Sequence, residues 1–367
     1  MSTPTVNTST ELRNVSLYDA TQADLAQLFA GQPKYRVEQV WQALYTQLKP
    51  IDEISNISAA MREQLASAFP PALILKTQQN NADGDTVKFL WTLRNGQHPI
   101  ETVLMLYQDR ATVCVSTQAG CAMGCGFCAT GQAGFSRHLT AGEIVEQAIR
   151  AAQVALKLER RVSNVVFMGM GEPLANEGPV RAAVEKLHGD VGISARHLTV
   201  STVGIVPGIK ALTKWPLPVN LAVSLHAARD ELRNELVPIN KRYPLDMLME
   251  ACIDYLKVKN RRVTFEWALI DKVNDTDQDA EELAVLCKRL TPGAHVNLIP
   301  LNPTPGYSTR GSSGNHVRQF ASWLEDLGVN VTVRRNRGTD IDAACGQLAA
   351  GQAITPVTLG RREDTSD

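Results

Sequence analysis

Short amphipathic helices are predicted for the first part of the chain. Apolar residues recur at three- and four-residue spacing within residues 21–30 and again within residues 37–45. Gly31-Gln32-Pro33 separates the two stretches, because glycine and proline interrupt helices. We therefore expect a small helical domain over residues 1–70, whose first 14 or so polar residues form a disordered start.

The apolar period then changes from that of a helix to that of strands. Residues 87–93 and 102–107 have the composition of strands, and turn-forming residues precede the first and separate the two. This pattern predicts a short antiparallel β extension over residues 71–110.

Strands and helices alternate after residue 111. We predict strands over residues 112–117, 164–169, 197–202, 219–226, 262–270 and 295–302. Amphipathic helices are expected between several of them, at residues 140–158, 245–258 and 277–290. Strands joined by crossover helices pair in parallel, so the class is α/β, and six units are too few for a closed eight-stranded barrel. We predict a partial (βα)6 barrel over residues 111–350, with an edge strand near 329–335 and a flexible tail over 351–367.

Composition narrows the function only a little. The formal net charge of the 367 residues is -1, so any nucleic-acid-binding surface has to be local. The polar N-terminus and the lack of a long apolar run lead us to expect a cytoplasmic protein with no membrane contact. Seven cysteines argue against a disulfide framework, and we assign Cys252 and Cys287, inside predicted helices, to the core.

The cysteine triplet is the most specific chemical feature. Cys121, Cys125 and Cys128 follow the first barrel strand with the spacing C-x3-C-x2-C. Three thiolates from one loop can bind three irons of a [4Fe-4S] cluster and leave the fourth iron open. A zinc site with His138 as fourth ligand is the alternative, although the second C-x2-C pair typical of such sites is missing.

Several motifs in order give the chain a family resemblance. They are Ile100-Glu101-Thr-Val, the stretch from Cys114 to Cys121, the triplet with Ala129-Thr-Gly, Gly171-Glu172-Pro-Leu, Ser224-Leu-His-Ala, Asn297-Leu-Ile-Pro-Leu-Asn302-Pro, and Ala344-Cys345-Gly-Gln-Leu. With them the chain, from about residue 17 to 346, resembles the radical S-adenosylmethionine (SAM) superfamily and, within it, the RlmN-type dual-specificity RNA methyltransferases. The resemblance implies a radical-SAM barrel, a [4Fe-4S] cluster and SAM as cofactor.

The same resemblance implies a set of SAM contacts at the ends of the strands. The set comprises Gly171, Glu172, Ser201, Ser224, Leu225, His226 and Asn302. The alternative for each residue taken alone is structural: Glu172 as a helix cap in a surface turn, the serines as strand-end caps, and Leu225 and His226 as core residues. Thr202 offers a hydroxyl similar to that of Ser201.

Three further residues carry the chemistry that the resemblance implies. The resemblance implies methylation of the C2 carbon of adenine in RNA. This carbon has no nucleophilic lone pair that could attack the methyl group of SAM, so a carbon radical has to be made. Cys345 takes a methyl group from one SAM, a 5'-deoxyadenosyl radical from a second SAM removes a hydrogen from it, and the methylene radical adds to C2. Cys114 then resolves the enzyme–RNA adduct through a transient disulfide, and Glu101 accepts a proton. Read without the family, Cys114 and Cys345 are buried apolar residues and Glu101 is a solvent-facing strand residue.

The implied partners are 23S rRNA, tRNA and an electron donor such as flavodoxin or ferredoxin, with the chain a monomer. Candidate RNA contacts are Lys241-Arg242, Arg261-Arg262, the run from Arg334 to Arg337, and Lys34-Tyr35-Arg36 in the helical domain, although charge runs are often solvated faces. Three alternatives stay open: a Cfr-like enzyme that methylates adenine C8, another radical enzyme such as a glycyl-radical activase, and a non-catalytic metal-binding RNA module.

Overall fold

The computed structural model describes residues 15–94, 96, 98–290 and 293–351. The predicted disordered start and nearly all of the predicted flexible tail therefore lie outside the described residues. Within the described part, no helix combines the length and the apolar character needed to cross a membrane.

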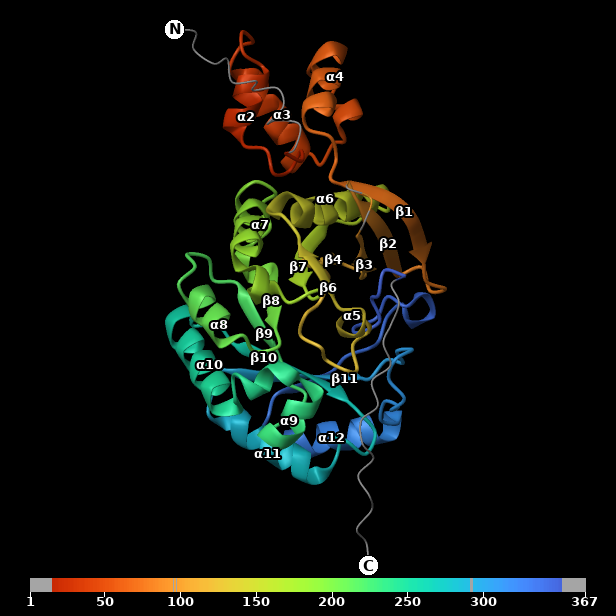
Figure 1. The fold of residues 1–367 in the computed structure, drawn as a ribbon, viewed down its shortest axis with the longest axis vertical. Coiled ribbons are helices and arrows are strands. Elements are labelled where there is room, and N and C mark those ends of the chain that lie inside the picture. The colour runs from red at the N-terminus through yellow and green to blue at the C-terminus, as the bar shows by residue number, and fades with distance from the viewer. Residues whose placement is uncertain (1–14, 95, 97, 291–292, 352–367) are drawn as a thin grey trace, which may run out of the picture.

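Three helices form the N-terminal end of the molecule (Figure 1). They are α2 (Gln22–Leu28), α3 (Tyr35–Tyr45) and α4 (Ala59–Ala68), with the short helix η1 (Ile51–Glu53) between the last two. Thr21 and Asp24 form a capping box that begins α2. The Asp19 carboxylate attaches this region to the barrel, since it accepts hydrogen bonds from the hydroxyl of Thr140 (2.7 Å) and the backbone N–H of Gly142 (2.5 Å).

An antiparallel extension leads into the barrel sheet. It consists of β1 (Leu73–Asn80), β2 (Thr86–Leu93) and β3 (Pro99–Leu106), and β3 pairs antiparallel with the first barrel strand. The strands β2 and β3 agree with the predicted ones. We did not predict β1, because only Leu73 of its eight residues is buried and the rest face solvent at the sheet edge.

Parallel strands make up the rest of the ten-stranded sheet. In spatial order they are β4 (Ala111–Cys114), β7 (Val162–Phe167), β8 (Leu198–Thr202), β9 (Asn220–Ser224), β10 (Val263–Leu269), β11 (Ala294–Pro300) and β12 (Val331–Val333). Every neighbouring pair in this series is parallel. The predicted α/β partial barrel of six parallel strands is therefore confirmed, with β12 as the edge strand.

Helices cover the outer face of this sheet (Figure 1). They are α6 (Ala141–Lys157), α7 (Glu177–Gly189), α8 (Val206–Thr213), α10 (Leu245–Lys259), α11 (Asp277–Lys288) and α12 (Gly314–Asp326). The short helix α9 (Asp230–Leu236) instead packs against the cysteine loop at the carboxyl ends of the strands. Short helices lie in the connections: η2 (Pro173–Asn176), η3 (Ala195–His197), η4 (Pro238–Lys241) and η5 (Thr339–Ile341). Cys252 and Cys287 are buried in α10 and α11, as expected.

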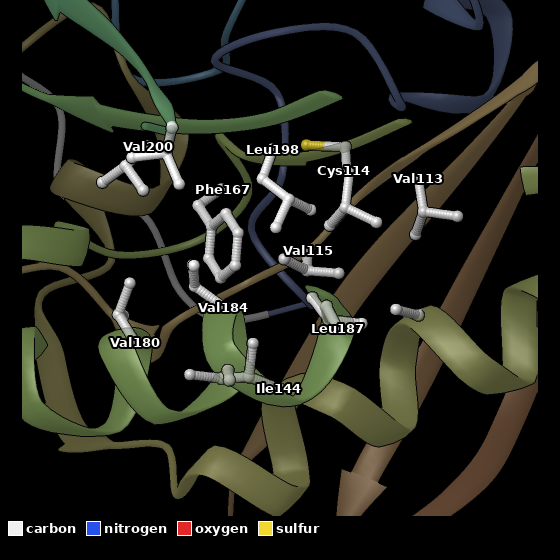
Figure 2. Close-up of a cluster of buried hydrophobic side chains, with 14 of the residues drawn as sticks. Val113, Cys114, Val115, Ile144, Phe167, Val180, Val184, Leu187, Leu198 and Val200 are labelled. Carbon is white, nitrogen blue, oxygen red and sulfur yellow. The ribbon is translucent and has the colours of Figure 1, made fainter. Parts of the chain in front are cut away.

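The alternation along β4 and the next residue, Val115, separates the core from the barrel interior. Figure 2 shows Val115 on the side of Ile144 and Leu187, which belong to α6 and α7, while the sulfur of Cys114 lies on the opposite side. Successive side chains of a strand face opposite sides, so the strand contributes to the core and to the interior at once.

A small hairpin carries the cysteine loop. Its strands are β5 (Gln118–Gly120) and β6 (Phe135–His138), and the four-residue helix α5 (Ala129–Gln132) lies between them. Gly120 has a φ of +74°, and a Cβ there would come within 1.9 Å of the Gly134 carbonyl oxygen. Only glycine allows this close crossing of the two strands, which fixes both ends of the loop. The sequence did not lead us to expect this hairpin, because its strands are only three and four residues long.

Candidate active site

The three clustered cysteines line one pocket at the carboxyl ends of the parallel strands. Backbone hydrogen bonds fold their loop: Cys128 N–H donates to the Cys125 carbonyl (3.1 Å), and Cys121 N–H donates to that of Gly134 (2.7 Å). This pocket, here named the cysteine pocket, is also lined by Gly171, Glu172, Ser201, Ser224, His226, Asn302 and Cys345. The fold thus brings together predicted residues from six separate segments.

The donor set fits an iron–sulfur cluster. Burial raises the pKa of Cys121 to about 12 and that of Cys125 well above its usual range, and the neighbouring sulfurs add to both shifts. Thiols so placed become thiolates only beside a strong positive charge, which clustered irons supply. Among the described residues, no three His, Cys, Asp or Glu side chains are grouped to hold a single metal ion. The candidate zinc ligand His138 instead contacts Gln118, with 3.1 Å between ring and amide nitrogens.

Glu172 combines a capping role with a place in the pocket wall. One carboxylate oxygen accepts the N–H of Leu174 (2.9 Å) at the start of η2, and the other accepts that of Val203 (2.8 Å). The side chain is 2% exposed, and burial raises its pKa to about 7. Gly171 before it has a φ of +100°, and a Cβ there would lie 2.5 Å from that of Gln118, so the backbone can adopt this position only with glycine.

The polar side chains at the ends of β8 and β9 differ in whether the protein already uses their hydrogen-bonding atoms. Ser201 Oγ donates to the Phe167 carbonyl (2.7 Å). His226 has a φ of +58° and accepts the N–H of Ala268 at Nδ1 (3.0 Å), while burial lowers its pKa to about 3. A neutral ring that accepts at Nδ1 carries its proton on Nε2, so His226 can donate one hydrogen bond. Ser224 also lines the pocket, and Thr202 beside Ser201 does so too.

Leu225 is the one member of this predicted set whose side chain lies elsewhere. It is fully buried in the main core and lies outside the cysteine pocket. Its backbone is fixed on both sides: its N–H donates to the Glu266 carbonyl (3.0 Å), and its carbonyl accepts from Arg233 Nε (3.0 Å). The completely buried Arg233 also donates to the Val203 carbonyl (2.6 Å) and so holds the ends of β8 and β9 together.

Cys345 is exposed at the rim of the cysteine pocket, and hydrogen bonds to the backbone carbonyls of its segment fix its position. Its carbonyl accepts a hydrogen bond from Asn302 Nδ2 (3.0 Å). The carbonyls of Gly346 and Leu348 accept from the Ala129 N–H (2.8 Å) and the Thr130 hydroxyl (2.5 Å), both in α5. The Cys345 segment is therefore bonded directly to the helix that follows Cys128.

A second pocket connects Cys114 with Cys345. This barrel pocket is lined by interior-facing residues of the parallel strands, among them Cys114, Asn164, Thr199 and Thr264, and by Cys345 and Cys128. Cys345 and Cys128 line both pockets. Burial raises the pKa of the Cys114 thiol strongly, and the Cys345 sulfur adds to that shift.

Glu101 is buried rather than solvent-facing. Its carboxylate pairs with Lys88 (3.1 Å), and one oxygen accepts the N–H groups of Ala349 (3.0 Å) and Ala350 (2.9 Å). It lies outside the residues that line the two pockets. In this state the carboxylate holds the segment that follows Cys345.

Two polar residues stand where the two pockets meet, and of these the sequence pointed only to Arg334, as a candidate RNA contact. Glu266 on β10 and Arg334 after β12 line both pockets together with Cys345. The sequence does carry a signal for Glu266: a glutamate in the middle of the apolar strand Val-Thr-Phe-Glu-Trp-Ala-Leu indicates a functional residue, since buried carboxylates are uncommon.

The candidate RNA contacts are unequally placed. Arg334, Arg335 and Arg337 line the barrel pocket, and Arg110 joins them there. Lys241-Arg242, Arg261-Arg262 and the residues Lys34 to Arg36 lie outside both pockets.

Comparison with known proteins agrees with the fold and the site. The family model of the radical SAM superfamily matches residues 115–284. A crystal structure of a radical SAM methyltransferase from Sphaerobacter thermophilus superimposes with a TM-score of 0.87 at 47% identity, covering 92% of this chain and 99% of that one. The fold and the cysteine pocket therefore define a radical SAM methyltransferase.

Curated relatives narrow the class to one family. A protein of Frankia casuarinae named "Probable dual-specificity RNA methyltransferase RlmN" is 50% identical over 91% of this chain and 82% of its own length. One of Chloroflexus aurantiacus with the same name is 46% identical over 92% of this chain and 93% of its own. The chain belongs to the RlmN family of dual-specificity RNA methyltransferases.

Proposed function

We propose that this enzyme methylates C2 of adenine in 23S rRNA and tRNA through a methylated Cys345. The observation that supports this most directly is the shared pocket of Cys114 and Cys345, adjoining the cysteine loop. A simple transfer to a nucleophilic atom needs no such pair of thiols. We further propose that it acts in the cytoplasm as a monomer, with a flavodoxin or ferredoxin as electron donor.

The cysteine pocket is the proposed cofactor site. Cys121, Cys125 and Cys128 would hold the [4Fe-4S] cluster, whose fourth iron then has room for SAM. Gly171, Glu172, Ser201, Ser224, His226 and Asn302 would surround SAM, and Leu225 would contribute through its backbone alone. When bound, the cluster and SAM supply a methyl group and a radical able to remove hydrogen from it.

The chain's own residues would then make and break two bonds to sulfur. The Cys345 sulfur carries the methyl carbon, which becomes bonded to C2 of the base and so links enzyme to RNA. Glu101 is the proposed acceptor of the C2 proton, which requires its carboxylate to leave the N–H groups of Ala349 and Ala350. The unpaired electron that remains on the adduct would pass to the [4Fe-4S] cluster. The Cys114 thiolate attacks the Cys345 sulfur, a disulfide forms, the sulfur–carbon bond breaks, and the released carbon takes up a proton.

RNA binding would use the cationic side of the barrel pocket. The target base has to leave its stack to reach Cys345. Arg334, Arg335, Arg337 and Arg110 line that pocket and would contact the phosphates on either side of the base.

The product of the reaction tests the proposal. Wild-type enzyme incubated anaerobically with rRNA or tRNA should give 2-methyladenosine, measured by mass spectrometry of the nucleosides. A product consisting only of 8-methyladenosine would favour the Cfr-like alternative. If no 5'-deoxyadenosine forms under the same conditions, the chain is a non-catalytic RNA module and the proposal is wrong.

Variants of Cys345 and Cys114, the two proposed catalytic cysteines outside the cluster loop, should stop the reaction at different steps. We expect Cys345→Ala to give neither methylated enzyme nor a link to RNA, because the methyl carrier is gone. Cys114→Ala should still be methylated and should accumulate enzyme covalently joined to RNA, because the resolving thiol is gone. Denaturing electrophoresis with labelled RNA separates the two outcomes.

Cys287→Ala is the matched control for this pair, since its thiol lies in the core of α11 and lines neither pocket. It should turn over without trapped RNA. Normal turnover by Cys114→Ala would remove the resolving role from that residue.

A further inference from the structure

Glu266 is a buried carboxylate that neither the fold nor the proposed chemistry has yet used. Its neighbours on β10, Phe265 and Trp267, are fully buried core residues, whereas Glu266 faces the barrel interior and is 5% exposed. Burying a carboxylate is costly unless it is paired or bonded.

Only half of this carboxylate is bonded. Oε1 accepts a hydrogen bond from Asn297 Nδ2 (2.8 Å), and Asn297 lies directly opposite on β11. Among the described residues, Oε2 accepts no hydrogen bond and Glu266 forms no ion pair within 4.0 Å. The guanidinium of Arg334 is near enough to favour the ionised form, although burial raises the pKa of Glu266 overall.

In two other buried glutamates, both carboxylate oxygens accept hydrogen bonds. Glu146 in α6 accepts the backbone N–H groups of Ala72 (2.9 Å) and Leu73 (3.4 Å), one on each oxygen. Glu172 likewise uses both oxygens. Glu266 is the exception, and it lines both pockets where they meet.

That junction is also where the target base has to be. Cys345, which would carry the methyl group, lines both pockets, as Glu266 does. Burial raises the pKa of the Cys345 thiol, and the carboxylate of Glu266 adds to that rise. A base bonded to the methyl carbon of Cys345 would therefore occupy the junction that Glu266 lines.

We propose that Glu266 is a specificity-determining residue whose Oε2 accepts a hydrogen bond from the 6-amino group of the target adenine. The inference rests on the proposed adenine C2 chemistry. Adenine presents an N–H donor at position 6, whereas guanine and hypoxanthine present a carbonyl oxygen there. A carboxylate attracts the first and repels the second, so Glu266 would select adenine before reaction.

Inosine gives the sharpest test of the variant, because its base keeps the C2–H and differs from adenine only in the carbonyl oxygen at position 6 and the proton on N1. We compare kcat/KM for a short RNA substrate carrying adenosine or inosine at the target position. For wild-type enzyme, inosine should lower kcat/KM by roughly 100-fold or more, since a buried polar group is left facing a like partner. In Glu266→Gln the ratio should shrink to about 10-fold or less, because the side-chain amide can rotate to donate to the carbonyl oxygen.

Glu146→Gln is the matched control, a buried carboxylate changed in the same way outside both pockets. It should keep the wild-type ratio. The KM for SAM and the iron content should be unchanged in Glu266→Gln. If that variant discriminates adenosine from inosine as wild type does, or loses SAM affinity with the ratio intact, the inference is wrong.

A second measurement needs no variant. RNA with purine riboside at the target lacks the 6-amino group entirely, and wild-type enzyme should bind it about 10-fold more weakly by anisotropy. Equal affinity for the two RNAs would overturn the inference. Failure of the proposed function looks different, because wild-type enzyme would then form no 2-methyladenosine from any of these substrates.

Discussion

The two faces of the barrel sheet use buried polar groups in opposite ways. On the outer face, Gln147 of α6 bonds to the Thr102 hydroxyl (2.8 Å) and to the Ser116 N–H (2.8 Å) and carbonyl (3.0 Å), so its amide is used at both ends. On the inner face, Glu266 has one open oxygen and Cys345 presents its thiol at the junction of the two pockets.

The difference separates groups that hold the fold from groups that await a ligand. A polar group buried with all its partners stabilises one arrangement of the elements it joins. One buried with an open position costs stability until something binds it. Changes on the outer face should therefore affect stability more than chemistry, and changes on the inner face the reverse.

The largest expected effect is on the inner face, at the cysteine loop. Cys121→Ser should reduce iron and sulfide to near zero and abolish methylation, because two thiolates cannot retain the cluster. The free energy of unfolding of the metal-free protein should change little, since Cys121 is only partly buried at the pocket wall. Iron analysis, the visible absorption of reconstituted protein and urea unfolding measure the three quantities.

Cys252→Ser is the control for Cys121→Ser, because it makes the same change at a cysteine in the core. Its thiol is fully buried in α10, and a hydroxyl there costs roughly 1–3 kcal/mol if it finds no partner. The variant should nevertheless bind a full cluster. Stoichiometric zinc without iron–sulfur absorption in the wild type would contradict the assignment of the loop.

A substitution in the core tests how far packing on the outer face of the sheet stabilises the fold. Leu187 of α7 is fully buried in the cluster that Figure 2 shows beneath β4 and β7. Leu187→Ala should lower the free energy of unfolding by about 2–5 kcal/mol, through lost burial and the cavity left behind. Urea unfolding measures this loss. The adenosine-to-inosine ratio of the folded fraction should stay at the wild-type value, and a changed ratio would break the separation of the two faces.

A gradual effect is expected in the pH dependence of stability. Burial raises the pKa of Glu146 from its usual value of 4.5 to about 7, so between these values the folded protein keeps a proton that the unfolded chain has released. Stability contributed by this group is complete below about pH 4.5 and falls as pH rises towards 7, by up to roughly 3 kcal/mol. Glu146→Gln removes the titration and should flatten the decline, measured by urea unfolding at several pH values. Parallel curves for variant and wild type would contradict this.

Local pattern was enough for the architecture and for the cysteine loop. The six parallel strands and helices such as α6 and α10 are visible in the sequence, because a buried face imposes its period on adjacent residues. The triplet Cys121, Cys125 and Cys128 is likewise local, since one short loop supplies all three thiols. The edge strand β1 escaped prediction because its exposed residues carry no such period.

Placement across the chain was decided only by the tertiary structure. The sequence alone identified Cys114 and Cys345 through family motifs and implied that they meet in a transient disulfide, but not which residues line the pocket that they share. It gave no indication that Glu101 pairs with Lys88 and holds the backbone of the Cys345 segment. Glu266 faces the junction of the pockets because the sheet curves into a barrel and points its side chain inward. Such contacts join residues far apart in the chain, and no local period encodes them, so packing of the whole sheet determined which polar groups are bonded and which remain open.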